Sequence, residues 1–314
     1  MTSDTLPVVT LAILNYQRRA LLRETVQAAL GQDYPHLDIL VVDNASTDGS
    51  PEMIRDVFPQ VRLLSLPANI GCAARNQGIA NAQGDLVITL DNDVCLTQPD
   101  GVRRAVDVMA DQPNTAGANF KILNPEGQLS TRDWCHPRDW RHFADHTFFT
   151  DYVLEGASVL RRGPFEAVGG YWEPLFIGHE GHDLAYRLLN AGYDLVYTPE
   201  ICVTHAVSSE ARASSRIYYT FTRNAIWVSL RHHRLGGAAR AITKYIALMA
   251  FTSLRAGHFG GYLLGLWDGL CGAPRAWRTR QPMQAATYAK LRRLRELRPS
   301  LLQKVKRHVQ EQPI

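Results

Sequence analysis

Two aspartates separated by a single residue, Asp91 and Asp93, directly follow the apolar run 86–90 and give this sequence its sharpest chemical signal. In open parallel sheets, ligands bind beyond the carboxyl ends of the strands. Paired carboxylates at that edge favour Mg²⁺ or Mn²⁺, which could bridge the oxygens of a diphosphate. Asp and Asn are also ordinary turn residues, so the triplet 91–93 taken alone does not establish a site.

Two further polar segments follow the same logic in the first third of the chain. Asp43 ends the apolar run 37–42, where a carboxylate can accept hydrogen bonds from a ribose hydroxyl or a base N–H. The alternative is a polar turn that caps the next helix, for which Ser50 is well suited. Segment 69–78 opens a helix with small residues that let a ligand approach, and Arg75 can reach a base or a phosphate.

A third group of chemically capable residues lies about 90 residues further along, at Glu180, His182 and Asp183. Carboxylates away from the paired aspartates could act as a general base for an attacking hydroxyl. The alternative is that they are acids favoured at a helix N-terminus. His205, at the end of the next strand pattern, could complete a metal site or bind a phosphate, although a lone histidine is more often structural.

The elements that must position these residues alternate between strand and helix patterns over the first 125 residues. Strands are predicted at 8–14, 37–42, 61–66 and 85–90, and helices at 18–30, from 50 onwards and at 71–82. Later patterns predict a strand at 152–160, a helix at 182–191, a strand at 193–198 ended by Pro199, and helices from 216 onwards. This order predicts an α/β fold with a mostly parallel sheet, helices on both faces, and a helical C-terminal extension.

Composition and charge narrow the class of protein. The chain of 314 residues is 46% hydrophobic and 20% charged, which predicts a globular protein. Its five scattered cysteines and the absence of a signal-peptide pattern predict a cytoplasmic location. Segment 275–314 carries a charge of +9, which predicts an anionic partner such as a membrane surface or nucleic acid, or else a solvated helix face. The apolar stretch 245–271 is interrupted by charges, so we expect no transmembrane span, whereas a segment lying on a membrane stays open.

The motifs in this order resemble family 2 inverting glycosyltransferases of the GT-A fold. The resemblance covers about residues 6–230. It rests on Ile13-Leu14-Asn15-Tyr16, on Val42 to Ser50, on Asn69-Ile70-Gly71 with Ala74 to Gly78, on Asp91-Asn92-Asp93, and on the stretch from Glu180 to His205, which resembles the acceptor-side segment of the family. It implies a catalytic domain at 1–210, with a nucleotide-sugar-binding half at 1–125 and an acceptor-side half at 126–210, followed by a basic helical extension at 211–314.

The resemblance also implies roles for individual residues. The nucleotide-sugar site would comprise Asn15, Asp43, Asn69, Gly71, Arg75, Asp91 and Asn92. Asp93 would bind a divalent metal, Mn²⁺ or Mg²⁺, with His205 as a further ligand. The reaction would be a single displacement in which a hydroxyl attacks the anomeric carbon of a UDP-linked or dTDP-linked sugar.

One position departs from the family pattern. The family usually has Glu-Asp where this chain has Glu180-Gly181, and the Asp of that pair is the usual candidate base. Glu180, His182 or Asp183 could substitute. We prefer Glu180 and keep Asp183 as a second catalytic candidate, although it matches a residue that opens the following helix. The departure leaves open a non-catalytic GT-A protein that binds a nucleotide sugar.

Two other functional classes are disfavoured. A nucleotidyltransferase usually has a glycine-rich loop near its N-terminus, and the turn 15–19 contains no glycine. A nucleic-acid-binding protein would need a recognisable reading motif, which the sequence lacks. The C-terminal third instead resembles bacterial enzymes, rhamnosyltransferase-like members among them, that extend cell-surface glycans. That similarity implies a glycan or polyprenyl-linked acceptor and a peripheral enzyme at the inner face of the cytoplasmic membrane.

Overall fold

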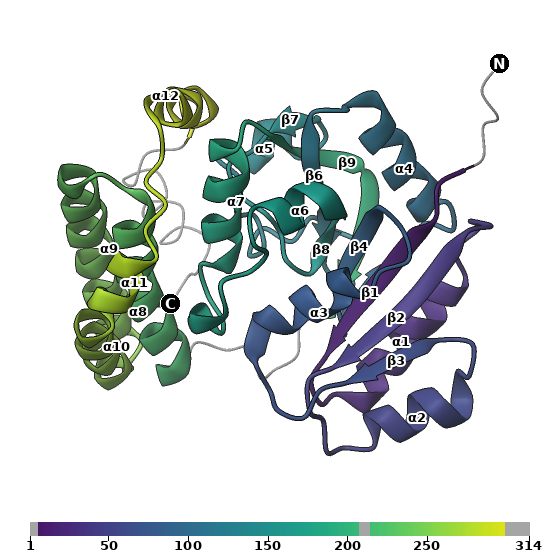
Figure 1. Ribbon diagram of the computed structural model, residues 1–314. Helices are drawn as coiled ribbons and strands as arrows, with labels where there is room; N and C mark the ends of the chain where they lie inside the picture. The colour runs from purple at the N-terminus through teal and green to yellow at the C-terminus, as the bar shows by residue number, and fades with distance from the viewer. Residues whose placement is uncertain (1–5, 207–213, 299–314) are drawn as a thin grey trace.

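The computed structural model describes residues 6–206 and 214–298. Within them, nine strands form one sheet in the order β3-β2-β1-β4-β8-β6-β9-β5, with β7 paired to β9 (Figure 1). The strands are β1 (Val9–Asn15), β2 (Leu37–Asp43), β3 (Arg62–Ser65), β4 (Leu86–Asp91), β5 (Val94–Leu96), β6 (Thr115–Leu123), β7 (Phe148–Phe149), β8 (Ala157–Arg161) and β9 (Asp194–His205). The helices are α1 (Arg19–Leu30), α2 (Ser50–Val57), α3 (Ala74–Ala80), α4 (Gly101–Asp111), α5 (Trp140–Phe143), α6 (Arg162–Ala167), α7 (Glu180–Asn190), α8 (Ser215–His232), α9 (Leu235–Arg255), α10 (Phe259–Cys271), α11 (Ala273–Arg278) and α12 (Ala285–Leu294), with short 3₁₀ turns η1 (Gly71–Ala73) and η2 (Glu173–Leu175).

The expected α/β architecture is confirmed. Strands β3, β2, β1 and β4 are parallel neighbours, and β8 then joins β4 in the antiparallel direction. Along β1, Leu11 and Ile13 belong to a core that contains side chains of α1, α2 and α4, whereas Ala12 belongs to a core that contains side chains of α3, α6 and α7. Alternate residues of a strand face opposite sides, so the sheet is buried on both faces.

The parallel register brings the predicted polar residues to one edge of the sheet. Asn15 pairs with Asp43 at the ends of β1 and β2, and Leu14 pairs with Asp91 at the end of β4. The carboxyl ends of three neighbouring strands therefore present Asn15, Asp43 and Asp91 side by side.

Three local predictions need correction. Pro199 does not end a strand, because β9 continues to His205; the pairing of β9 with β6 is irregular at this point, and such an irregularity tolerates a residue without an N–H. The helix predicted at 71–82 is divided into η1 and α3. Ser50 begins α2 instead of capping it, because Gly49 precedes it with φ 81°, and both the N–H and the hydroxyl of Ser50 donate to Asp48.

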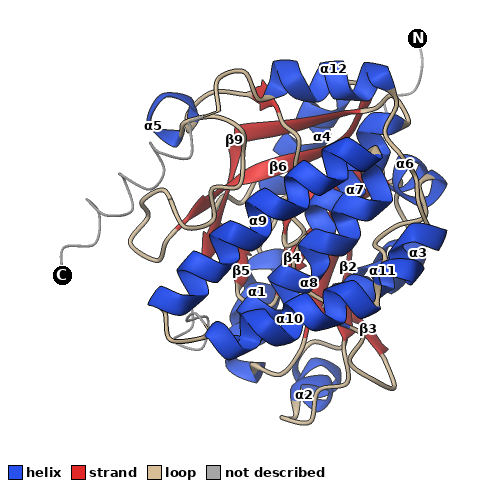
Figure 2. Cartoon of the chain, turned by 90° about the vertical axis from the view of Figure 1, so that its left-hand side faces the viewer, coloured by secondary structure: helices blue, strands red, loops and turns tan. Residues whose placement is uncertain are grey.

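The C-terminal region is helical over the described residues 214–298, as expected, and α8, α9 and α10 pack together along one side of the molecule (Figure 2). The rest of the expected extension, 299–314, lies outside the described residues. Gly261, Gly265 and Gly269 allow α10 to approach closely, since a Cβ at Gly261 or Gly265 would overlap the backbone of α8. Among the described residues, no helix is both long and apolar enough to cross a bilayer. The domain boundary expected near residue 210 lies outside the described residues, so the division of the chain at that point stays a prediction.

Candidate active site

Asp43 and Asn15 form the buried floor of the site. Asp43 is 1% exposed, and its carboxylate accepts hydrogen bonds from Asn15 Nδ2 at 2.7 Å and from the N–H of Ser46 at 2.9 Å. Asn92 Nδ2 donates in turn to Asn15 Oδ1 at 2.8 Å. The two asparagines therefore fix the orientation of the carboxylate at the strand ends.

The turn after β1 is held in a strained conformation over this floor. Gln17 and Arg18 have φ values of 57° and 61°, which non-glycine residues adopt only at a cost. Ser46 Oγ accepts a hydrogen bond from the N–H of Gln17, and Asn92 Nδ2 donates a hydrogen bond to the carbonyl of Gln17. The turn places the guanidinium of Arg18 2.5 Å from Asp93 Oδ2.

Asp91 is the most accessible of the three aspartates. Its side chain is 43% exposed, whereas the Arg75 side chain with which it forms an ion pair is 6% exposed. A Cβ at Gly156 would overlap the Asp91 carboxylate. The glycine, in the segment just before β8, therefore leaves room for this carboxylate. Arg75 and Gly156 together fix the position of a carboxylate that faces solvent.

Asp93 and His205 meet although they come from different parts of the chain. Strand β5 pairs antiparallel with the end of β9, and His205 Nε2 lies 3.7 Å from Asp93 Oδ1. His205 Nδ1 contacts Asp133 Oδ2 at 3.0 Å, and the hydrogen bonds to Asp133 and Asp93 raise the pKa of His205 to about 10. A divalent metal bound at His205 Nε2 would take the place of the proton on that nitrogen.

The side chains at this place fit a metal that also binds the donor. No cluster of three or more His, Cys, Asp or Glu ligands occurs in residues 6–206 and 214–298. Asp93 and His205 offer one carboxylate and one imidazole, and Asp133 can orient the ring from its other nitrogen, as a carboxylate commonly does beside a metal-bound histidine. Oxygens of a diphosphate would have to supply the other ligands.

Asn69 and Gly71 lie beside the site, and their contacts stabilise the loop between β3 and α3. Asn69 Oδ1 accepts from the N–H of Gly71 and from Asn44 Nδ2. Gly71 has φ 66°, and a Cβ there would overlap the carbonyl of Phe176. The segment is thus fastened between the end of β2 and η2, and it leads into the helix that carries Arg75.

Glu180, the preferred base, begins α7 and is 7% exposed. Burial raises its pKa, and its Oε2 has no hydrogen-bond partner among the described residues. A second carboxylate, Glu155, lies near it, and burial together with the negative charge of Glu180 raises the pKa of Glu155 to about 8. Two acids with raised pKa values therefore lie close together at the start of α7.

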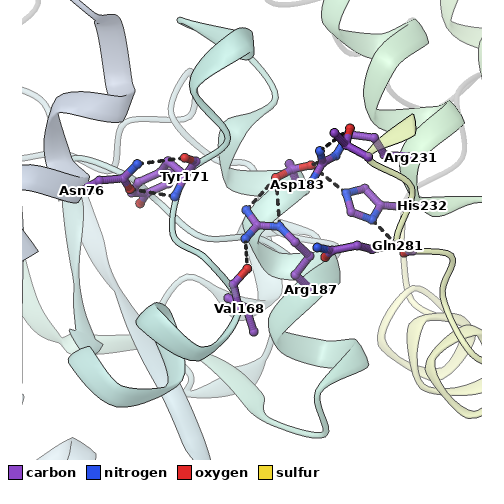
Figure 3. Close-up of polar contacts among 9 residues, drawn as sticks. Asn76, Val168, Tyr171, Asp183, Arg187, Arg231, His232 and Gln281 are labelled. Atoms are coloured by element: carbon purple, nitrogen blue, oxygen red, sulfur yellow. Dashed lines mark hydrogen bonds and ion pairs between the residues drawn. The ribbon is translucent and has the colours of Figure 1, made fainter. Parts of the chain in front are cut away.

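The structure places Asp183 in a closed ionic network. Its side chain is 1% exposed, and its carboxylate contacts Arg187 at 2.6 Å, His232 at 2.7 Å and Arg231 at 3.0 Å (Figure 3). Burial alone would raise the pKa of Asp183, but the charge of Arg187 and the bond from His232 hold it far below its usual value. Three cationic or histidine partners and almost no accessible surface favour a structural role in which Asp183 joins α7 to α8, and a catalytic Asp183 stays a prediction.

Three residues of the site have no counterpart in the sequence-based prediction. Arg18, Asp133 and Glu155 lie in a turn, a loop and a pre-strand segment, where polar residues are common. Only Glu155 carried a local signal, because it stands directly before Gly156 and the apolar run of β8. The others are identified by their contacts with Asp93 and His205.

Comparisons with known proteins agree with this geometry. The model of glycosyl transferase family 2 matches residues 10–168, half of the chain. Succinoglycan biosynthesis protein ExoO of Rhizobium meliloti (strain 1021) is 32% identical over 38% of this chain and 34% of its own length. The N-acetylglucosaminyl-diphospho-decaprenol L-rhamnosyltransferase of Mycobacterium tuberculosis (strain ATCC 25618 / H37Rv) is 29% identical over 65% of this chain and 76% of its own. The match to O-antigen biosynthesis protein RfbC of Myxococcus xanthus spans only 18% of that protein.

Solved structures show the same fold. The mannosyltransferase PcManGT of Pyrobaculum calidifontis, in complex with GDP-Man and Mn²⁺, superposes with a TM-score of 0.57 at 19% identity, over 98% of this chain and 85% of its own. S. aureus TarS 1-349 in complex with UDP-GlcNAc gives a TM-score of 0.58 at 15% identity, over 87% and 84%. Together with the family match over the strand ends that carry Asp43, Asp91 and Asp93, they lead to one conclusion: the chain belongs to glycosyl transferase family 2.

Proposed function

We propose that this glycosyltransferase moves a sugar from a UDP-linked or dTDP-linked donor to a hydroxyl of a glycan or lipid-linked acceptor, with inversion at the anomeric carbon. The observation that carries the proposal is the convergence of Asp43, Asp91 and Asp93 at one sheet edge, with Arg75 held against Asp91. Acids at that edge suit ribose hydroxyls and a metal-bound diphosphate.

Each of these residues has a distinct task in the proposal. Asp43 receives hydrogen bonds from the base or the ribose, and Arg75 keeps Asp91 directed at the donor. Asp93 and His205 would hold Mn²⁺ or Mg²⁺, which supplies charge neutralisation for the departing diphosphate. Arg18 now pairs with Asp93 at 2.5 Å and adds a second positive charge beside the leaving group.

The acceptor side is proposed to extend from α7 toward the C-terminal helices. A cavity of about 380 Å³ lies between α7, α8 and α9, with His179, His182, Lys244 and Arg298 among its lining residues. Apolar side chains of α8 and α9 complete its walls, so it combines the cationic Lys244 and Arg298 with an apolar surface. A polyprenyl diphosphate sugar, the acceptor in the name of the mycobacterial relative, has matching chemistry.

We also propose that the helical extension rests on an anionic membrane surface. One face of α10 packs on α8, and the opposite face exposes large apolar side chains: Leu263, Leu264, Trp267 and Leu270. Trp267 is 67% exposed, and exposed Arg275 and Arg278 follow on α11. Apolar and tryptophan side chains flanked by arginines favour the interface of a bilayer that contains anionic lipids.

Vesicle flotation tests the membrane proposal. The protein should float with phosphatidylglycerol-containing vesicles, and Trp267→Ser should weaken this binding. Leu235→Ser, at the far end of α9 and equally exposed, should not. Equal flotation of all three proteins, or none with the wild type, would refute the proposed surface.

A thermal-shift panel tests the donor site. UDP, dTDP, GDP and CDP are each added with Mn²⁺, Mg²⁺ or EDTA to wild type, to Asp93→Ala and to the exposed control Asp56→Ala. A ligand that binds only the folded state raises the midpoint. We expect UDP or dTDP to raise it in the presence of metal, and this shift to be lost only in Asp93→Ala. A wild type that responds to none of the nucleotides would refute the proposed function.

The alternative function, nucleotide-sugar binding without catalysis, is favoured by the glycine at position 181. It predicts the same thermal shifts but no turnover. Release of nucleoside diphosphate from a bound donor separates the two functions, and the configuration of the product's anomeric carbon tests inversion.

A further inference from the structure

Gly181 lies where a neighbouring segment has taken the space of a side chain. A Cβ built at Gly181 would overlap Glu155 Oε1 and the carbonyl of Val153, and it would lie 2.8 Å from Tyr152 Cζ. Segment 152–155 therefore packs directly on the first turn of α7. The two oxygens nearest to the absent side chain are the carbonyl oxygen of Val153 and a carboxylate oxygen of Glu155.

The backbone that follows Glu155 connects its carboxylate to Asp91, at the edge of the sheet proposed to bind the donor. Gly156 follows it, and the carbonyl of Gly156 accepts a hydrogen bond from the N–H of Asp91 at 3.2 Å. The overlap predicted for a Cβ at Gly156 shows that this chain also touches the Asp91 side chain. Glu155 is thus placed between the exposed aspartate of the donor edge and the start of α7, where the donor and acceptor sides meet.

The surroundings of Glu155 keep a carboxylate oriented and basic. The hydroxyl of Tyr152 lies 3.2 Å and 3.3 Å from the two oxygens of Glu155. Burial and the nearby charges of Glu180 and Asp91 raise the pKa of Glu155, while the charge of Arg75 opposes them. A carboxylate whose pKa lies near neutrality can hold a proton that it has just accepted.

Glu180 is less suited to the same task. It is 7% exposed, and its unpartnered Oε2 is enclosed, whereas Glu155 is partly exposed. The charge of Glu180 acts on Glu155 through their proximity. Glu180 is then a positioning residue that makes Glu155 more basic.

We propose that Glu155 is the general base of the transfer, in the space left free by Gly181, and this assignment rests on the proposed function. The acceptor O–H bond breaks as the oxygen forms a bond to the anomeric carbon, and the proton passes to the Glu155 carboxylate. The bond between the anomeric carbon and the phosphate oxygen breaks, and its electron pair leaves with the nucleoside diphosphate. No group is oxidised or reduced.

The test compares Glu155→Gln, Glu155→Asp and Glu180→Gln with Glu166→Gln, an exposed glutamate on α6. Water serves as the acceptor probe, and UDP-glucose, UDP-N-acetylglucosamine and dTDP-rhamnose serve as donors, with release of nucleoside diphosphate as the readout. Glu155→Gln should lower kcat by at least about 100-fold, the usual contribution of a general base, while the thermal shift with UDP or dTDP and metal is retained. Glu155→Asp, which keeps the charge, should lose less.

The pH dependence provides an independent readout. In the wild type, kcat/KM should rise with pH toward about 8, because the base must be ionised, and this ascending limb should be absent from the residual rate of Glu155→Gln. Glu180→Gln should move the limb to lower pH, because one negative charge is removed beside Glu155. An unchanged rate in Glu155→Gln, or a larger loss in Glu180→Gln than in Glu155→Gln, would overturn the assignment.

Failure of the proposed function gives a different pattern. A wild type that shows neither a nucleotide-dependent thermal shift nor release of nucleoside diphosphate would refute donor binding and transfer as a whole. A wild type that binds and turns over a donor, together with a fully active Glu155→Gln, would refute only the role of Glu155.

Discussion

The backbone of Gly156 lies against the carboxylate of Asp91, so closely that a Cβ at position 156 would overlap Asp91 Oδ2. The same carboxylate forms the ion pair with Arg75. The glycine and Arg75 therefore together direct the Asp91 carboxylate toward solvent.

Replacing Gly156 by alanine should displace Asp91 and break its pairing with Arg75. Because small displacements in a site of this kind cost about 100-fold in rate, we expect kcat/KM for the donor to fall by about 10-fold to 100-fold. Gly163→Ala is the matched control, since a Cβ there has no neighbour within 4 Å. Wild-type donor kinetics in Gly156→Ala would contradict the proposed use of Asp91.

Replacing His205 by alanine should weaken metal binding. Asp93 would be left as the single described side-chain ligand, so the Mn²⁺ concentration needed for the nucleotide-dependent thermal shift should rise. Asp133→Asn should raise it by about 10-fold to 100-fold, because the ring of His205 loses the carboxylate that orients it. His142→Ala, which changes an exposed histidine on α5, is the control. An unchanged metal titration in His205→Ala would exclude the histidine as a ligand.

Replacing Asp183 by asparagine should destabilise the fold. The change leaves Arg187 and Arg231 buried without their shared carboxylate, and loss of one partner from a buried ion pair costs about 3–5 kcal/mol. Chemical denaturation should show this loss in the free energy of unfolding, whereas Asp111→Asn, at the exposed end of α4, should be neutral. A stable Asp183→Asn protein that had lost only turnover would instead support a catalytic role.

The stability of the protein should fall as pH is lowered from 6.5 toward 4. Burial lowers the pKa of His136 to about 3, and burial lowers that of His179 to about 4. The unfolded chain therefore binds more protons than the folded chain in this window, and its free energy falls relative to the native state as pH decreases. Denaturation curves at pH 7.5 and pH 5 should differ accordingly.

His136→Gln provides the check on that interpretation. The amide stays neutral in both states, so stability should depend less on pH between 6.5 and 5 than in the wild type. The variant must be compared with itself across pH, because loss of the bond between His136 and Thr150 changes its stability at every pH. An identical slope in both proteins would show that other groups cause the acid sensitivity.

The sequence by itself determined the edge of the sheet at which Asp43 and Asp91 meet. Apolar runs before Asp43 and Asp91 predict buried strands, and the alternation of strands with helices predicts that they are parallel, so their polar ends meet. The predicted strands and helices of the first 90 residues match the structure apart from their ends and the division of 71–82 into η1 and α3, because each depends on a local pattern. The pattern of segment 43–50 does not predict one of its roles. Ser46 and Asp48 accept hydrogen bonds from the backbone N–H groups of Gln17 and Arg19, and so hold the strained turn after β1.

Only the tertiary structure decided which distant residues join that edge. His205 reaches Asp93 through antiparallel pairing of β5 with β9, and no local pattern specifies that register. The sequence leaves Asp183 either a candidate base or an acid at a helix start, and the packing of α8 places Arg231 and His232 against it. Glu155 came to the start of α7 because Gly181 has no side chain to exclude it. Secondary structure follows from short-range patterns, whereas burial and long-range contacts decide which carboxylates stay accessible and basic.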